Sequence, residues 1–198
     1  MIKRNAYLLT INTNSDRFKY CNELLTKIGF IVIPFTAIYN DNKVLSNKIS
    51  MQNIYEIIIK NGEEWAYVFE DDIDLIEYIN IDEIVQYESI SEMFFYLGCC
   101  RYSNHIIKTD NKINNHIVYK VSNCVRGLHA IGLSLKGAKE LLELSKILVD
   151  YYYMDVVLEQ FCIKYPANVI RYDLKSYIYN HRGIFYQNRK VFNSLIST

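Results

Sequence analysis

The segment WAYVFEDDIDL, residues 65–75, constrains the fold more than any other part of the chain. Its first half is an apolar run of strand length, and its second half places Glu70, Asp71, Asp72 and Asp74 within five positions. An ionised carboxylate is too costly to bury alone, so a cluster that ends a buried strand must reach water, a cation or a protonated partner. A hard divalent cation needs only one or two carboxylates when phosphates supply its other oxygen ligands. A solvated acidic turn is the alternative interpretation.

The length and composition of the chain exclude several classes of protein. A chain of 198 residues favours one domain, residues 1–198. The 22 basic and 22 acidic residues balance, so no overall field draws the protein to nucleic acid or to an anionic membrane. No apolar run approaches the ~20 residues that span a bilayer, and the five cysteines lack the spacing of a zinc site. We therefore expect a soluble, cytoplasmic protein with free thiols, no transmembrane segment and no nucleic-acid partner.

The amino-terminal part of the chain predicts a strand, a helix and a second strand. Residues 6–11 and 30–35 are apolar runs of strand length. The helix between them begins with a cap from Ser15 or Asp16 and ends at Gly29. Such a unit builds a parallel sheet, in which ligands bind at the carboxyl ends of the strands.

The acidic cluster then follows a third predicted strand. A helix begins at Ser46 and ends at Gly62, and the strand of residues 65–69 comes next. Three strand ends therefore converge on one crevice. The other predicted elements are an edge strand at 73–80, a helix at 81–87, a strand at 93–97, an irregular loop at 98–116, strands at 117–121 and 128–134, helices at 135–147 and 155–164, and a tail at 167–198 that includes a short strand at 169–170 and packs on or closes the site.

Several segments, in this order, resemble glycosyltransferase family 25, which includes lipopolysaccharide and collagen galactosyltransferases, and related viral glycosyltransferases. They are YLLTINTNSDRF, IPFTAIYND, WAYVFEDDIDL, GLHAIGLSLKGAKELLE and YYMDVVLEQ. One departure is His129, which stands where the family has an aromatic residue and which we expect to be a hydrogen-bonded core side chain. The resemblance implies a GT-A fold, an α/β fold with a Rossmann-like, mixed, mostly parallel sheet flanked by helices. It also implies a nucleotide-sugar donor and a divalent metal, Mn²⁺ or Mg²⁺, held on the diphosphate by an acidic motif.

The resemblance suggests roles for the acidic residues. Asp72 is the expected metal ligand, Glu70 its catalytic support or a partner of a sugar hydroxyl, and Asp71 a donor-side residue. If the strand continued through them, alternation would place Glu70 and Asp72 on one side and Asp71 on the other. His181 in the tail is a candidate further metal ligand, with a core-edge or surface histidine as the alternative.

The other candidates belong to the donor and the acceptor sides. Arg17 suits phosphate or an acidic neighbour, because a guanidinium makes paired contacts with oxyanions. A charge on the surface of the helix is an equally open interpretation of Arg17. Further donor-binding candidates are Thr10, Asn12, Thr36 and Ala37, although ordinary turn chemistry also explains polar residues there.

Asp155 is the candidate base that deprotonates the acceptor, with Asp150 in reserve. The alternative role for Asp155 is a plain helix cap.

These inferences favour a metal-dependent, inverting glycosyltransferase that moves a sugar from a nucleotide sugar, preferably a UDP-sugar, to a glycan or protein-linked acceptor. Two alternatives stay open: a metal-dependent phosphoryl transferase or nuclease, and a module that binds a nucleotide sugar without turnover. A glycoside hydrolase is disfavoured, because adjacent carboxylates on one strand point to opposite faces and cannot flank a bond.

Overall fold

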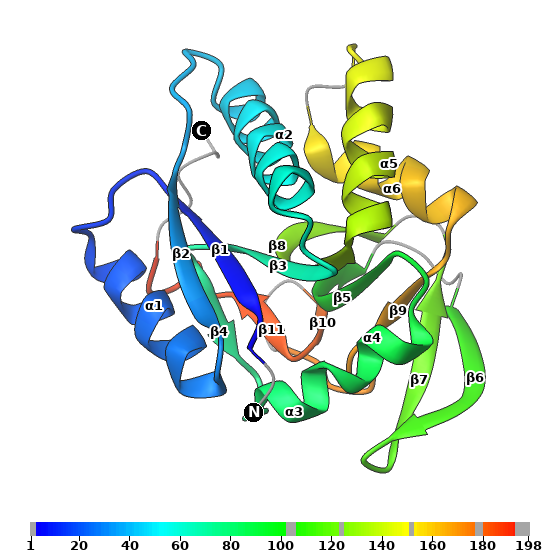
Figure 1. Ribbon diagram of the computed structural model, residues 1–198. Helices are drawn as coiled ribbons and strands as arrows, with labels where there is room; N and C mark the ends of the chain where they lie inside the picture. Colours follow the sequence, from blue (N-terminus) through cyan, green and yellow to red (C-terminus); the bar gives the residue numbers. More distant parts are fainter. Residues whose placement is uncertain (1–2, 102–105, 123–124, 151–152, 177–179, 193–198) are drawn as a thin grey trace.

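The computed structural model in Figure 1 describes residues 3–101, 106–122, 125–150, 153–176 and 180–192. Its centre is a mixed sheet with the strand order β2-β1-β3-β8-β5-β9-β7-β6, with β10 paired to β5. The elements are β1 Asn5–Thr10, α1 Asp16–Ile28, β2 Ile31–Thr36, α2 Lys43–Asn61, β3 Trp65–Glu70, β4 Ile73–Leu75, α3 Ile81–Ile84, α4 Gln86–Ile90, β5 Phe94–Arg101, β6 Ile106–Ile113, β7 His116–Val121, β8 Val125–Ser134, α5 Leu135–Ile147, α6 Met154–Lys164, β9 Ala167–Val169, β10 His181–Gly183 and β11 Phe185–Gln187.

The predicted strand, helix, strand unit at the amino terminus is confirmed. The hydroxyl of Ser15 accepts a hydrogen bond from the amide of Phe18 and caps α1. Gly29 ends the helix in the left-handed region, at φ +116°. A residue with a side chain would be strained in this backbone conformation. The chain then returns as β2, parallel to β1, with Thr10 opposite Thr36.

Helix α2 begins three residues earlier than predicted. The reason is Asn42, whose side-chain oxygen accepts from the amides of Val44 and Leu45 and so caps the helix at that point. After α2, β3 pairs parallel to β1, with Leu9 opposite Glu70. The carboxyl ends of β1, β2 and β3 therefore lie together at one edge of the sheet, as predicted.

The rest of the sheet explains why it is mixed. Strand β8 lies between β3 and β5 and is antiparallel to both, while β9 is parallel to β5. Strands β1, β2, β3, β5 and β9 therefore run in the same direction, and β8 runs against them. The predicted α/β fold, with a Rossmann-like, mixed, mostly parallel sheet flanked by helices, is confirmed.

Helices cover both faces of the sheet, which is why its central strands are continuous apolar runs. Tyr7 and Leu9 pack with α2, α5 and α6, whereas Ala6 and Leu8 pack with α1, α3 and α4. The alternation of side chains along β1 thus supplies both cores. Figure 1 shows α2, α5 and α6 on one side of the sheet and α1 on the other. No helix of the described ranges is long and apolar enough to cross a membrane.

The prediction of an irregular loop at residues 98–116 was wrong for its described part, and residues 102–105 of it lie outside the described residues. Strand β5 continues to Arg101, and β6 forms a hairpin with β7. Strand β6 lies at the edge of the sheet and exposes most of its polar side chains, so its sequence lacks the apolar character of a buried strand. The turn of this hairpin contains Asn114 and Asn115, both at positive φ, which Asn tolerates.

Two smaller predictions also need correction. Only Ile73–Leu75 of the expected edge strand at 73–80 forms β4, and the helix expected at 81–87 is two short helices, α3 and α4. The short strand expected at residues 169–170 is β9, which spans Ala167–Val169.

Two short strands near the carboxyl terminus were not predicted. Strand β10 pairs with β5, and β11 pairs with β4, the strand that directly follows the acidic cluster. Residues 185–189 are thereby carried to the same edge of the sheet as Asp72. Strands of three residues are too short to show a periodicity.

Candidate functional site

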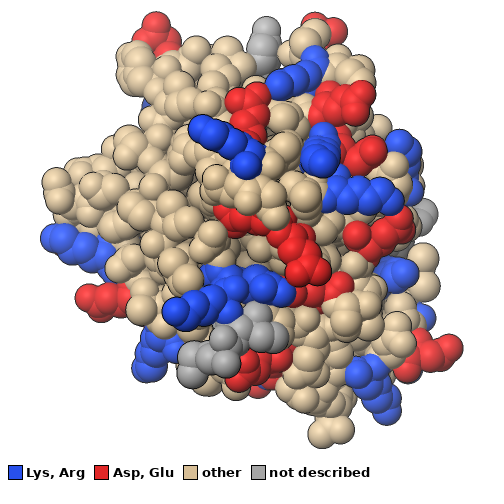
Figure 2. Space-filling view, in the orientation of Figure 1, with Lys and Arg blue, Asp and Glu red and all other residues tan. Residues whose placement is uncertain are grey.

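A cavity of about 460 Å³ opens where β1, β2 and β3 end. Figure 2 shows acidic side chains gathered in a hollow at the centre of this face, with basic side chains beside them. The cavity is lined by Leu9, Thr10, Ile11, Arg17, Ala37, Tyr39, Asn40, Lys43, Ser46, Asn47, Glu70, Asp71, Asp72, Gln187 and Arg189. Three carboxylates thus share the lining with three basic side chains.

Asp71 is held by two side chains from the amino-terminal unit. Its Oδ1 lies 2.5 Å from Nη2 of Arg17, and its Oδ2 accepts a 2.5 Å hydrogen bond from the hydroxyl of Thr10. Nε of Arg17 also donates to the backbone carbonyl of Asp71 at 3.2 Å. Asp71 is 4% exposed, so this pairing satisfies a carboxylate that would otherwise be buried at high cost. Of the roles considered for Arg17, the structure shows it holding an acidic neighbour.

Asp72 is equally buried, at 5% exposure, but is satisfied on one side only. Its Oδ2 accepts from Nε2 of Gln187 at 3.4 Å and lies 4.0 Å from Nη2 of Arg17. Its Oδ1 has no hydrogen-bond partner among the described residues. Burial raises the pKa of Asp72, and Arg17 and Arg189 oppose that rise. A buried carboxylate oxygen without a partner is costly and needs an explanation.

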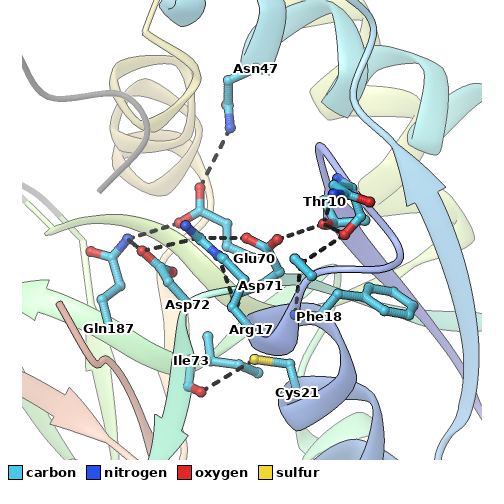
Figure 3. A network of polar contacts seen from close by, with 12 residues as sticks. Thr10, Arg17, Phe18, Cys21, Asn47, Glu70, Asp71, Asp72, Ile73 and Gln187 are labelled. Carbon is cyan, nitrogen blue, oxygen red and sulfur yellow. Dashed lines mark hydrogen bonds and ion pairs between the residues drawn. The ribbon is translucent and has the colours of Figure 1, made fainter. Parts of the chain in front are cut away.

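Glu70 ends β3 and lies beside Asp72. Its Oε2 accepts from Nε2 of Gln187 at 2.9 Å, and its Oε1 accepts from Nδ2 of Asn47 at 3.5 Å (Figure 3). Burial and the charge of Asp72 raise the pKa of Glu70 to about 8. Glu70 therefore carries a proton at neutral pH unless a cation enters the site.

The alternation considered for the acidic residues does not operate. Strand β3 ends at Glu70, and residues 71–72 form a turn before β4 begins. As a result Glu70, Asp71 and Asp72 all line the same cavity.

The donor-binding candidates divide into two groups. Thr10, Arg17 and Ala37 line the cavity, as does Asp71, whereas Asn12 and Thr36 do not. The side-chain oxygen of Asn12 accepts from the amide of Asn14 at 2.9 Å, which is ordinary turn chemistry. Thr36 is an exposed side chain at the end of the edge strand β2.

Asp155 lies outside the cavity lining but within electrostatic range of it. It is the second residue of α6, whose capping residue is Tyr153, and the side chain of Tyr153 makes no capping hydrogen bond. Asp155 is therefore not the capping residue, although its carboxyl group accepts hydrogen bonds from the backbone amides of Asp155 and Val156 in the first turn. Its negative charge contributes to the raised pKa of Glu70, and burial raises the pKa of Asp155 itself.

His181 and His129 form a buried pair away from the cavity lining. His181 is 1% exposed on β10, and its ring centroid lies 5.0 Å from that of His129. Burial lowers the pKa of His181 to about 4 and that of His129 to about 3, so both are neutral above these values. A ring nitrogen of His129 lies 3.3 Å from the carbonyl oxygen of Phe185, as expected for a hydrogen-bonded core histidine. Within the described residues, no group of three or more His, Cys, Asp or Glu is placed to hold a metal ion.

Several lining residues were given no individual role by the sequence. Lys43 and Asn47 lie four residues apart on α2, a spacing that puts them on one face of the helix, and this was the available signal. Tyr39 and Asn40 follow β2, whose carboxyl end is one of the three strand ends predicted to converge on one crevice. Gln187 and Arg189 reach it only because β11 pairs with β4. That pairing leaves no local trace in the sequence.

Comparison with known proteins supports the fold and leaves the family open. No protein-family model and no curated protein matches the chain. UDP-glucose pyrophosphorylase in complex with UDP-glucose is similar in structure, with 9% sequence identity, a TM-score of 0.50, and coverage of 96% of this chain and 95% of that one. CTP:phosphocholine cytidylyltransferase from Streptococcus pneumoniae matches at 13% identity and a TM-score of 0.49, over 94% and 93% of the two chains. A protein from STIV, A197, matches at 13% identity and a TM-score of 0.48, over 84% of this chain and 81% of that one. The first of these likenesses supports the Rossmann-like fold, and the resemblance to glycosyltransferase family 25 stays a prediction.

Proposed function

We propose that this protein is a metal-dependent glycosyltransferase that binds a nucleotide sugar, preferably a UDP-sugar, in the cavity at the ends of β1, β2 and β3. The observation that carries the proposal is Oδ1 of Asp72, a buried carboxylate oxygen with no hydrogen-bond partner among the described residues. A transferase of this kind needs a cation at such a position, and a plain acidic turn would leave its carboxylates in water.

The residues present suit a hard divalent cation, Mn²⁺ or Mg²⁺. Oδ1 of Asp72 is the oxygen that would hold it, and Glu70 would support Asp72 through the amide of Gln187 that they share. Because such cations take much of their coordination from substrate phosphates and water, one protein carboxylate is sufficient. When bound, the cation would stabilise the negative charge that develops on the departing nucleoside diphosphate. His181, which does not line the cavity, is not assigned to the cation in this proposal.

The remaining lining suits the two ends of a nucleotide. Ile11 and Tyr39 are 61% and 85% exposed, so they offer apolar surface to a planar base. Arg17, Lys43 and Arg189 place positive charge around the carboxylates, where phosphates would otherwise be repelled.

Transfer with inversion requires one proton to leave the acceptor. The acceptor oxygen, from a glycan or a protein-linked glycan, forms a bond to the anomeric carbon while the bond from that carbon to the diphosphate oxygen breaks. Asp155 is the proposed base that takes the acceptor proton, because its half-buried carboxyl group has a raised pKa and lies in range of Glu70.

The proposal is tested by a thermal-shift screen of nucleotide sugars with and without Mn²⁺. A ligand of the native state raises the melting temperature, so a UDP-sugar should stabilise the wild type only when Mn²⁺ is present. Asp72→Asn, which keeps the shape of the side chain, should remove the effect of Mn²⁺. An equal shift in the wild type and in Asp72→Asn would refute the proposed cation site.

Nucleotidyl transfer is a second candidate, favoured by the likeness in fold to UDP-glucose pyrophosphorylase. The two activities give different products from a UDP-sugar. Sugar transfer or hydrolysis releases UDP, whereas pyrophosphorolysis with added pyrophosphate releases UTP and a sugar phosphate. A protein that binds the UDP-sugar and forms neither product is a binding module. Cleavage of nucleic acid without any sugar donor would point to a nuclease.

A further inference from the structure

Gln187 connects the two acidic side chains of the cavity to a basic one. Its Nε2 donates to Oε2 of Glu70 at 2.9 Å and to Oδ2 of Asp72 at 3.4 Å. Its Oε1 accepts from Nη2 of Arg189 at 3.1 Å. Figure 3 shows the amide of Gln187 directed at both carboxylates. An amide NH₂ group carries two hydrogens, so it can give one to each carboxylate and hold the pair side by side.

Arg189 determines which way the amide of Gln187 faces. If the amide were reversed, its oxygen would meet the two carboxylates and its NH₂ group would meet a guanidinium. The contacts with Asp72 and with Arg189 would be repulsive, because a carboxylate only accepts hydrogen bonds and a guanidinium only donates them. The hydrogen bond from Arg189 therefore selects the orientation that serves Glu70 and Asp72.

The backbone places Gln187 opposite the turn that carries the carboxylates. Gln187 pairs with Ile73 in the ladder between β11 and β4, and the amide of Asn188 donates to the carbonyl of Asp72 at 2.7 Å. Gln187 is itself 9% exposed. Backbone and side chain thus fix it in one position.

We propose that Gln187 is a positioning residue for the cation site. It holds Glu70 and Asp72 together and occupies Oδ2 of Asp72, so that Oδ1 is the oxygen left for a divalent cation. The choice of Mn²⁺ and UDP as probes rests on the proposed function, whereas the effect on the two carboxylates does not. The carboxyl-terminal strand β11 is then part of the site.

The decisive variant is Gln187→Leu, which removes the amide and leaves an apolar side chain one carbon shorter than that of Gln. Its matched control is Asn188→Leu on the same segment. Nδ2 of Asn188 donates to Oδ2 of Asp74 at 3.0 Å, so this change also removes a hydrogen bond from an amide to a carboxylate, but Asp74 does not line the cavity. If Gln187→Leu does not fold, Gln187→Met provides an unbranched side chain of similar length.

The first measurement is the affinity for Mn²⁺ in the presence of UDP. The electron paramagnetic resonance signal of free Mn²⁺ reports how much of the ion is unbound. Loss of a residue that orients a metal ligand lowers metal affinity by about 10- to 100-fold, and we expect a loss in that range for Gln187→Leu. For Asn188→Leu we expect no change beyond about twofold, since it leaves the oriented ligands intact. Equal affinity in the wild type and in Gln187→Leu would overturn the assignment.

The second measurement is a pair of ligand-free crystal structures, of the wild type and of Gln187→Leu. We expect the carboxylates of Glu70 and Asp72 to move apart in the variant, because nothing bridges them. Unchanged positions would overturn the assignment even if Mn²⁺ binds. If the wild type binds no Mn²⁺ with UDP, the proposed function fails, and these two structures still decide the role of Gln187.

Discussion

Arg17, which is partly exposed, forms an ion pair with the buried Asp71, with Nη2 of Arg17 2.5 Å from Oδ1 of Asp71. The pair connects the first turn of α1 to the turn after β3, two segments that are 54 residues apart in the chain. It explains why an acidic residue can be buried beside Asp72 without a cation of its own. Arg17 thus neutralises Asp71 and leaves Asp72 as the carboxylate open to a ligand.

The ion pair predicts a large effect of Arg17→Met on stability. The substitution keeps a long apolar side chain but leaves the carboxylate of Asp71 buried without its charge partner, which costs about 3–5 kcal/mol. Urea unfolding measures the change in the free energy of unfolding. Lys19→Met is the control, because the pair that Lys19 makes with Asp16 is exposed and contributes little. Adding Asp71→Asn to Arg17→Met should restore part of the lost stability, because the uncompensated charge is removed. If the losses in the free energy of unfolding of the two single variants simply add in the double variant, this account is contradicted.

Glu70 predicts an unusual dependence of stability on pH. Its folded pKa of about 8 lies above the ordinary value of 4.5, so between these values the folded state keeps a proton that the unfolded state loses. Stability without metal should therefore fall as pH rises from about 4.5 to 8, by up to about 1.4 kcal/mol for each pH unit. In Glu70→Gln this dependence on pH is absent, so the free energy of unfolding of the variant should increase relative to that of the wild type as pH rises. A constant difference between the two proteins from pH 5 to pH 8 would show that the pKa is not raised.

The buried histidines predict the opposite slope in acid. The folded pKa of His129 is about 3 and that of His181 about 4, both below the ordinary value of 6.5. The unfolded state therefore binds protons that the folded state does not, and stability falls as pH decreases from about 6.5 to 4. His129→Gln should lower the number of protons taken up on unfolding by about one and so reduce this slope, as measured by urea unfolding at a series of pH values. His116→Gln is the control, since His116 is partly exposed beside Asp173; an equal reduction there would refute the prediction.

Local signals in the sequence account for the parts of the fold and site that were predicted. Ser15 and Gly29 bound α1 by capping chemistry that involves neighbouring residues only. The convergence of Thr10 and Glu70 follows from the rule that parallel strands end at the same edge. Gln187 could not be placed in this way, because its position depends on the pairing of two three-residue strands more than 100 residues apart.

Asp155 predicts a separation between donor binding and transfer. Its carboxylate lies outside the lining of the cavity, so Asp155→Asn should bind a UDP-sugar with Mn²⁺ as tightly as the wild type. If Asp155 takes the acceptor proton, the same variant should lose transfer by about 10²- to 10⁴-fold, which is the usual contribution of a general base. Thermal shift measures the first quantity, and release of UDP in the presence of an acceptor measures the second. Asp150→Asn is the matched variant, because Asp150 is the other acidic candidate near the start of α6. Loss of transfer in Asp150→Asn with full turnover in Asp155→Asn would show that Asp150 is the base. Loss of UDP-sugar binding in Asp155→Asn would instead show that the side chain of Asp155 belongs to the donor site.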